Sequence, residues 1–263
     1  MQVGITQIIL PKLSTREFAA QAAAAGYEVV ELSMTKDGNL NPNLSDAEFR
    51  SLSDDIRAAG VEPVSMVHGH CSGNLLDSGD AQRISIEETC KGLQAAATMG
   101  IGCTLHTLGG FSAELYYDDA YKNAVKSLKE IAKTAESLKV KLAVEFVWNG
   151  FLFSPLEMRR FLDEIDSDYI GFYFDPGNMA VFQFPQHWVR IVGHRTKMVH
   201  LKDWKGSALN CDWPPLLEGD VDFAAVNKEL RAIGYDGPMI SEVDPDLASI
   251  EDTAKAIRKI ITM

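Results

Sequence analysis

The sequence predicts an α/β fold, a single (β/α)8 TIM barrel that spans residues 1–263. One local pattern recurs along the chain: a helix rich in Ala and Leu, a glycine that ends it, and a short β-branched run, as in AAAAG-YEVVELS and LRAIG-YDGPMISEV. No long linker or low-complexity tract divides the chain, and barrels of this size are common. An open doubly wound sheet would carry a glycine-rich phosphate turn after its first strand, and ITQIILPKLS contains none.

The eight strands follow in order along the chain. Each is a short apolar run that a helical segment separates from the next, and we expect them near residues 2–9, 28–33, 62–68, 102–107, 141–147, 170–175, 197–202 and 238–243. Serine and glutamate three residues apart mark three helix starts, namely Ser14 with Glu17, Ser45 with Glu48, and Ser154 with Glu157. A left-handed glycine cap is expected at four helix ends: Gly26, Gly60, Gly100 and Gly234. Alternating strands and helices predict parallel pairing throughout.

Composition and charge narrow the functional classes. With 46% hydrophobic and 24% charged residues, the chain has the make-up of an ordinary globular protein. Its net charge of −12 argues against nucleic-acid binding, which depends on Lys and Arg. No apolar run approaches membrane-spanning length, the first residues lack signal-peptide features, and the four cysteines form no CxxC pair. We therefore expect a cytoplasmic protein with no membrane partner.

Four polar residues stand at the carboxyl ends of the last four predicted strands: Glu145, Asp175, His200 and Glu242. In a parallel barrel these ends meet at one rim, where catalytic groups lie. Three converging carboxylates repel one another unless a cation joins them. Hard oxygen ligands with one imidazole predict one divalent metal, with Mn²⁺ as the expected ion and Mg²⁺ or Co²⁺ as alternatives. The other interpretation is that each residue is salt-bridged or faces a helix.

At these residues the chain resembles the xylose isomerase-like barrel superfamily, which includes ketose 3-epimerases, hydroxypyruvate isomerases, inosose dehydratases and endonuclease IV. The stretches VHLKDWKG and LLEGDVDFAAVNKELRAIGYDGPMISEVDP are similar to its inosose dehydratase and sugar epimerase branches. The resemblance implies that the same four residues hold the metal. It also implies a metal-dependent isomerase or epimerase that acts on a sugar or related polyhydroxy carbonyl compound through a metal-bound enediolate, with Glu145 and Glu242 transferring protons.

Three other functions stay open at this point. An inosose-type dehydratase is the second hypothesis, and a non-catalytic barrel that binds a sugar or a partner is the third; a homo-oligomer is compatible with each. Endonuclease IV is disfavoured by the acidic charge and by missing ligands, although His70 and His106 look like two of its extra metal ligands. The chain departs from ketose 3-epimerases at two positions. Asn178, three residues after Asp175, stands where those enzymes have a histidine. The arginine that they carry beyond the histidine of the seventh strand is absent, and the nearest cations here are Lys202 and Lys205.

The expected contacts to substrate come from the loops that follow the strands. We predict substrate binding by five residues: His70, His106, Asn178, Lys202 and Trp148. Aromatic rings such as Trp148 often stack on the apolar face of a sugar, and packing against a neighbouring loop is the alternative. If the protein is a dehydratase, the candidate acids are His70, His106 and Lys202. His68 is expected to point away from the site, on the alternate side of its strand.

Overall fold

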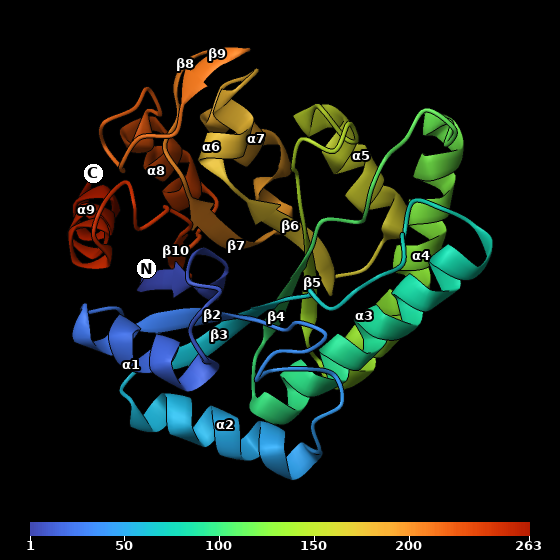
Figure 1. Cartoon of the computed structure of the whole chain (residues 1–263). Coiled ribbons are helices and arrows are strands. Elements are labelled where there is room, and N and C mark those ends of the chain that lie inside the picture. Colours follow the sequence, from blue (N-terminus) through green and yellow to red (C-terminus); the bar gives the residue numbers. More distant parts are fainter.

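The computed structural model describes all 263 residues and contains a closed barrel of eight parallel strands (Figure 1). Around the barrel the strands follow the order β1-β10-β7-β6-β5-β4-β3-β2, so the first strand pairs with the last. The predicted fold is confirmed. The barrel strands are β1 (Val3–Thr6), β2 (Val29–Ser33), β3 (Glu62–Val67), β4 (Cys103–His106), β5 (Lys141–Glu145), β6 (Ile170–Phe174), β7 (Thr196–Leu201) and β10 (Met239–Ser241).

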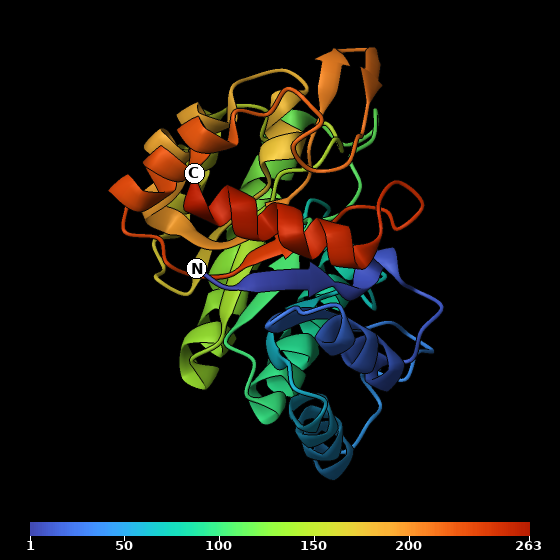
Figure 2. The same cartoon turned by 90° about the vertical axis from the view of Figure 1, so that its left-hand side faces the viewer.

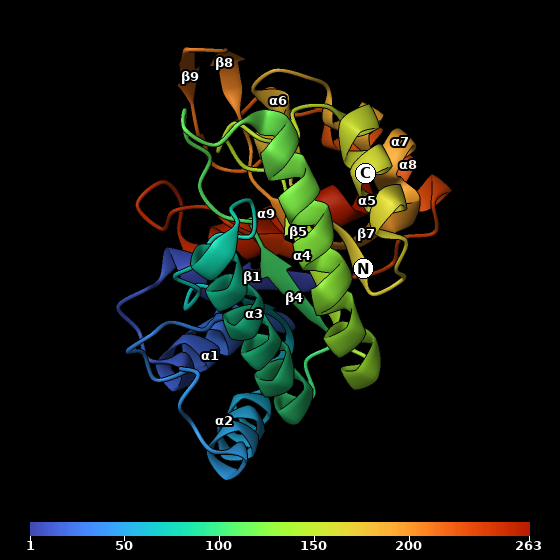
Figure 3. The same cartoon turned by 90° about the vertical axis from the view of Figure 1, so that its right-hand side faces the viewer.

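Helices surround the barrel on its outside. Figure 2 shows α9 lying across β1, and Figure 3 shows α3 and α4 side by side on another flank. No helix is both long and apolar enough to cross a membrane. The α-helices are α1 (Thr15–Ala24), α2 (Asp46–Ala58), α3 (Gly79–Met99), α4 (Tyr117–Leu138), α5 (Pro155–Ile165), α6 (Pro176–Ala180), α7 (Pro185–Val192), α8 (Phe223–Ala232) and α9 (Ile250–Thr262).

The helix boundaries follow the local signals in the sequence. Capping boxes with both reciprocal hydrogen bonds begin α1 at Ser14 and α2 at Ser45. At α5 the Ser154 hydroxyl accepts from the Glu157 amide, but the return bond from the Glu157 side chain is absent, so this box is only half formed. All four glycines expected at helix ends have positive φ, between 73° and 100°. Short-range capping chemistry therefore accounts for most helix limits.

Side chains alternate between the barrel interior and the layer beneath the helices. The interior holds a small cluster of six residues, and the larger core of 61 residues lies mostly between strands and helices. Because successive strand side chains point to opposite faces, residues two positions beyond an interior residue point the same way. Four interior residues precede the four strand-end polar residues by two positions: Ala143 and Glu145, Tyr173 and Asp175, Met198 and His200, and Ile240 and Glu242.

Two local features differ from the expectation. The predicted first strand stops at Thr6, because Gln7–Ile9 form a 3-10 turn whose start is capped by the Thr6 hydroxyl. After β7 the chain forms an antiparallel hairpin of β8 (Lys205–Ser207) and β9 (Asn210–Asp212), which the sequence did not predict. Figure 1 shows this hairpin projecting from the molecule beside α6. Its strands are exposed and too short to carry a hydrophobic pattern.

Candidate metal centre

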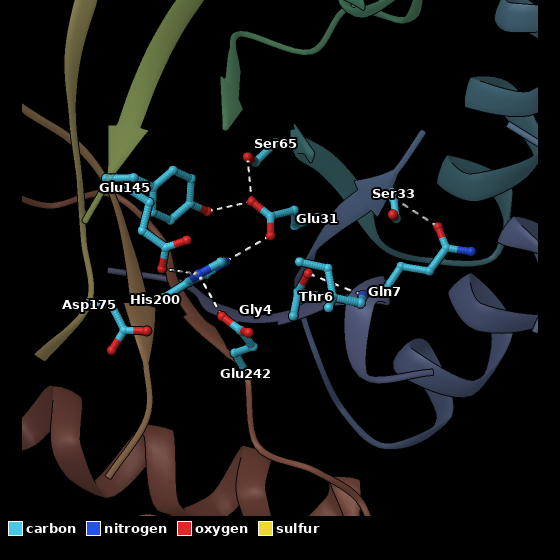
Figure 4. Close-up of polar contacts among 12 residues, drawn as sticks. Gly4, Thr6, Gln7, Glu31, Ser33, Ser65, Glu145, Asp175, His200 and Glu242 are labelled. Atoms are coloured by element: carbon cyan, nitrogen blue, oxygen red, sulfur yellow. Dashed lines mark hydrogen bonds and ion pairs between the residues drawn. The ribbon is translucent and has the colours of Figure 1, made fainter. Parts of the chain in front are cut away.

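The four strand-end residues converge inside the barrel mouth. One ligand atom from each of Glu145, Asp175, His200 and Glu242 lies within 4.8 Å of the other three. Glu145 is the last residue of β5, and His200 lies in β7. Asp175 directly follows β6 and caps α6, and Glu242 directly follows β10. Figure 4 shows the side chains directed toward one another from these neighbouring strands.

His200 stands at the middle of this cluster. Its Nδ1 atom lies 3.3 Å from Glu145 Oε1 and 3.1 Å from Glu242 Oε2. Its Nε2 atom donates to Glu31 Oε1 over 2.8 Å. Burial acts to lower the pKa of His200, but the surrounding carboxylates outweigh it and raise this pKa well above its usual range. The raised pKa favours the protonated ring, with Nδ1 facing the carboxylates.

The two glutamates of the cluster have opposite protonation tendencies. Burial raises the pKa of Glu145, and the proton-donating His200 only partly offsets it. Burial also acts to raise the pKa of Glu242, but the hydrogen bond and charge of His200, together with Lys202, bring it down to about 2. The site thus holds one carboxylate that gains a proton readily beside one that stays ionised, which is a combination found in acid–base pairs.

Asp175 and Lys202 complete the charge arrangement. Asp175 Oδ1 accepts from the amides of Gly177 and Asn178 at the start of α6. Its Oδ2 atom lies 3.0 Å from Lys202 Nζ, yet the angle is not that of a hydrogen bond, so this buried oxygen lacks a directional donor. Lys202 Nζ also lies 3.0 Å from Glu242 Oε2. Three carboxylates with free oxygens around one imidazole fit a divalent cation of the Mn²⁺ or Mg²⁺ type.

Asn178 contacts the cluster rather than open solvent. Its buried side-chain amide donates to Glu145 Oε1 over 3.2 Å and to the carbonyl of Phe146 over 3.1 Å. Trp148 is half exposed, donates through Nε1 to the Asn178 carbonyl, and packs against the Trp213 ring at a centroid distance of 4.7 Å. Asn178 therefore orients Glu145, and contacts of Asn178 and Trp148 with a substrate stay a prediction.

A cavity of about 640 Å³ opens directly beside the cluster. Lys202 and Asp203 after β7 and Glu242 after β10 line one side, and the chain from Asp212 to Pro214 and the loop that continues from Glu242 line the rest. Acidic side chains dominate its polar lining, with Asp203, Asp212, Asp244 and Asp246 in addition to Glu242, and Lys202 as its one cation. A cavity of this volume accommodates a small sugar.

His70 and His106 lie apart from this cavity. Leu105 faces the barrel interior, so its neighbour His106 points toward the helices instead. His70 Nε2 lies 2.9 Å from the Glu88 carbonyl of α3, and the His68 ring lies between His70 and His106. His68 points away from the interior, as expected. Contact of His70 or His106 with a substrate stays a prediction, since neither belongs to the four-residue cluster.

One residue of the centre was missed from the sequence. Glu31 of β2 is fully buried and accepts hydrogen bonds from Ser65, Tyr173 and His200 at 2.6, 2.6 and 2.8 Å (Figure 4). These bonds and the charge of His200 outweigh burial and lower the pKa of Glu31. The sequence does contain a sign of this residue, because Glu31 is a lone carboxylate inside the apolar run VVELS.

Comparison with known families matches nearly the whole chain. A family model described as "Xylose isomerase-like TIM barrel" matches residues 19–260. The chain belongs to this family. A curated relative from Escherichia coli K12, described as a putative L-ribulose-5-phosphate 3-epimerase, is 26% identical over 258 residues, which cover 92% of this chain and 88% of the relative. An uncharacterised protein of Methanocaldococcus jannaschii is 27% identical over 135 residues, which span about half of each chain (49% and 46%).

Solved structures share the fold at low sequence identity. A D-psicose 3-epimerase, crystallised in the presence of D-fructose, superposes with a TM-score of 0.82 at 16% identity over 100% of both chains. A D-tagatose 3-epimerase-like protein gives a TM-score of 0.83 at 19% identity over 100% of this chain and 97% of the other. The IolI protein with a bound zinc atom gives 0.79 at 16% identity over 100% and 98%.

Proposed function

We propose that this family member is a divalent-metal-dependent sugar epimerase or isomerase whose Glu145 and Glu242 transfer protons. The observation that carries the proposal is the convergence of both glutamates with Asp175 and His200 beside a sugar-sized cavity. The epimerases among the relatives and similar structures support the same reaction class. These similar proteins favour an epimerase or isomerase over the dehydratase and over a non-catalytic binding protein.

The four clustered residues would hold the ion, with Mn²⁺ expected from the mostly oxygen donor set. A bound divalent ion polarises a substrate carbonyl and makes the adjacent C–H more acidic. Side chains of the protein carry out the proton transfers. One glutamate removes the proton next to the carbonyl, which leaves an enediolate, and the other returns a proton to the opposite face. Asn178 orients Glu145, and Lys202 holds Glu242 in place.

The cavity favours a sugar without a phosphate group. Its single cation, Lys202, is already paired with Asp175 and Glu242. A phosphate, which carries nearly two negative charges at neutral pH, would meet Asp212, Asp244 and Asp246 and no free Arg or Lys. Phosphate sites in proteins instead supply Arg, Lys or helix amides. We therefore propose a free ketose as the substrate class, unlike the 5-phosphate in the description of the E. coli relative.

A panel of substrates tests both parts of this proposal. Free ketohexoses, ketopentoses and inososes and a ketopentose 5-phosphate are incubated with the metal-loaded enzyme in D₂O and read by NMR after metal removal. We expect deuterium beside the carbonyl and a new epimer from a free ketose, with kcat/KM at least about tenfold higher than for the phosphate. Loss of water would select the dehydratase. No reaction of any sugar by enzyme with confirmed bound metal would favour the binding protein.

Metal uptake at this centre should tighten as the pH rises. His200 carries a proton on Nδ1 between two carboxylates, and the raised pKa of His200 keeps it there at neutral pH. A metal ligand must lose that proton, so while His200 stays protonated each pH unit tightens Kd by about tenfold. Calorimetry in buffers of different ionisation enthalpy measures the effect and should report about one proton released per ion. Binding that neither releases protons nor varies with pH would contradict it.

A further inference from the structure

A second cluster of metal-binding side chains lies outside the barrel wall. The rings of His68 and His70 have a centroid distance of 5.5 Å, and those of His68 and His106 a distance of 5.7 Å. All three imidazoles are at least 94% buried at the ends of β3 and β4. The rings of His68 and His70 face α3, and Cys71 follows His70 in the chain. Figure 3 shows α3 lying over this flank of the barrel.

These imidazoles have nitrogens without any partner. Both nitrogens of His68, Nδ1 of His70 and Nε2 of His106 are buried and form no hydrogen bond. An unsatisfied buried polar atom costs about 1–3 kcal/mol, and native proteins rarely leave several together. The cluster therefore indicates ordered water or a bound ion in contact with these nitrogens.

The hydrogen bonds that do exist determine which nitrogens can bind a cation. His70 Nε2 donates to the Glu88 carbonyl over 2.9 Å, so its Nδ1 carries a free lone pair. A histidine whose second nitrogen donates to a backbone carbonyl is typical of metal ligands. His106 Nδ1 accepts from the Leu108 amide over 2.8 Å, so its Nε2 is a donor.

The spacing suits a tetrahedral ion. One nitrogen from each of His68 and His70 and the Cys71 sulfur all lie within 4.8 Å of one another. Zinc bonds to nitrogen of about 2.0–2.1 Å at tetrahedral angles place two ring centroids roughly 5.2 Å apart, close to the 5.5 Å observed. Space for the rings comes from Gly92 of α3, where a Cβ atom would lie 2.3 Å from the His68 ring and 3.0 Å from the His70 ring.

We propose that His68, His70 and Cys71 form a second metal site, for a borderline cation such as Zn²⁺, that joins the loop after β3 to α3. The fourth position would be open to a water molecule. Nitrogen and thiolate donors suit Zn²⁺, whereas the oxygen-rich centre in the barrel suits harder ions. Binding replaces the Cys71 thiol proton with the ion, and that proton leaves to the buffer.

Cobalt substitution tests this site separately from the barrel centre. Apoprotein is titrated with Co²⁺, which has a thiolate charge-transfer absorption band only when sulfur is a ligand. We expect two ions per chain and a thiolate band in the unchanged protein. Cys71→Ser should lose the band, and His68→Gln should weaken the binding that produces the band by at least about tenfold. The matched control is Cys90→Ser on α3, where the half-buried thiol donates to Thr134 of α4. This variant should keep both the thiolate band and the two bound ions.

The barrel variant Asp175→Asn separates the two sites. It should lose one ion per chain and retain the thiolate band, whereas Cys71→Ser should retain barrel binding. Circular dichroism checks that each variant is folded. One ion per chain in the unchanged protein, with no thiolate band, would overturn the second site and leave the barrel proposal standing. A thiolate band with no loss of metal in Asp175→Asn would support the second site and count against the barrel centre.

Discussion

Glu242→Gln should lower kcat by about 10²- to 10⁴-fold, the usual loss when a general acid or base is removed. The Glu242 carboxylate projects from the end of β10 into the cavity, 3.1 Å from His200 Nδ1 and 3.0 Å from Lys202 Nζ. An amide neither accepts a proton from carbon nor binds a cation as strongly as a carboxylate. We therefore expect weakened metal binding together with the loss of turnover, measured by epimer formation and by metal content.

The matched control is Glu251→Gln, an exposed glutamate in the first turn of α9. It makes the same chemical change at a residue outside both the cluster and the cavity lining, and it should leave both kcat and metal content unchanged. Full activity of Glu242→Gln would refute the mechanism. Assay at saturating metal separates the two roles of Glu242, since loss of turnover with the ion bound isolates proton transfer.

Glu31→Gln should weaken metal binding by about 10- to 100-fold, as expected when the hydrogen-bond partner of a ligating histidine is changed. The Glu31 carboxylate accepts from three donors, on Ser65, Tyr173 and His200. A glutamine amide has one accepting oxygen, so its NH₂ group must face at least one of these donors. When the amide oxygen stays with the Ser65 and Tyr173 hydroxyls, the NH₂ group faces His200, which loses the bond that orients Nδ1 toward the ion. Metal titration of the apoprotein measures the change in Kd.

Tyr173→Phe is the control for Glu31→Gln. It removes one donor to Glu31 but leaves the bond between Glu31 and His200 intact. It should lower the free energy of unfolding by about 1 kcal/mol and leave metal affinity unchanged. If Glu31→Gln alters only stability and not Kd, then Glu31 serves the fold and does not position His200.

Much of the fold could be predicted because its signals are local. The Ser14 and Ser45 capping boxes and the glycines that end helices depend on contacts within one turn. The alternation of strands with helices predicted the parallel barrel, and all eight strands lie where expected to within a few residues. The turn at Gln7–Ile9 and the hairpin from Lys205 were missed because neither carries a hydrophobic period.

The candidate site was only partly predictable. Residues at strand ends, such as Asp175 and His200, follow from the rule that carboxyl ends of barrel strands meet at one rim. The orientation of Asn178 toward Glu145 depends on how α6 begins, and the pairing of Lys202 depends on two other strands. These contacts join residues at least 27 positions apart, so no local pattern encodes them.

The sequence by itself determined the (β/α)8 class, the helix limits and the four polar residues that end neighbouring strands, because periodicity and capping act over a few residues. Only the tertiary structure decided that Glu31 supports His200, that aspartates line the cavity, and that His70 faces α3. Barrel closure brings strands from opposite ends of the chain together, and it thereby sets which side chains share a buried space.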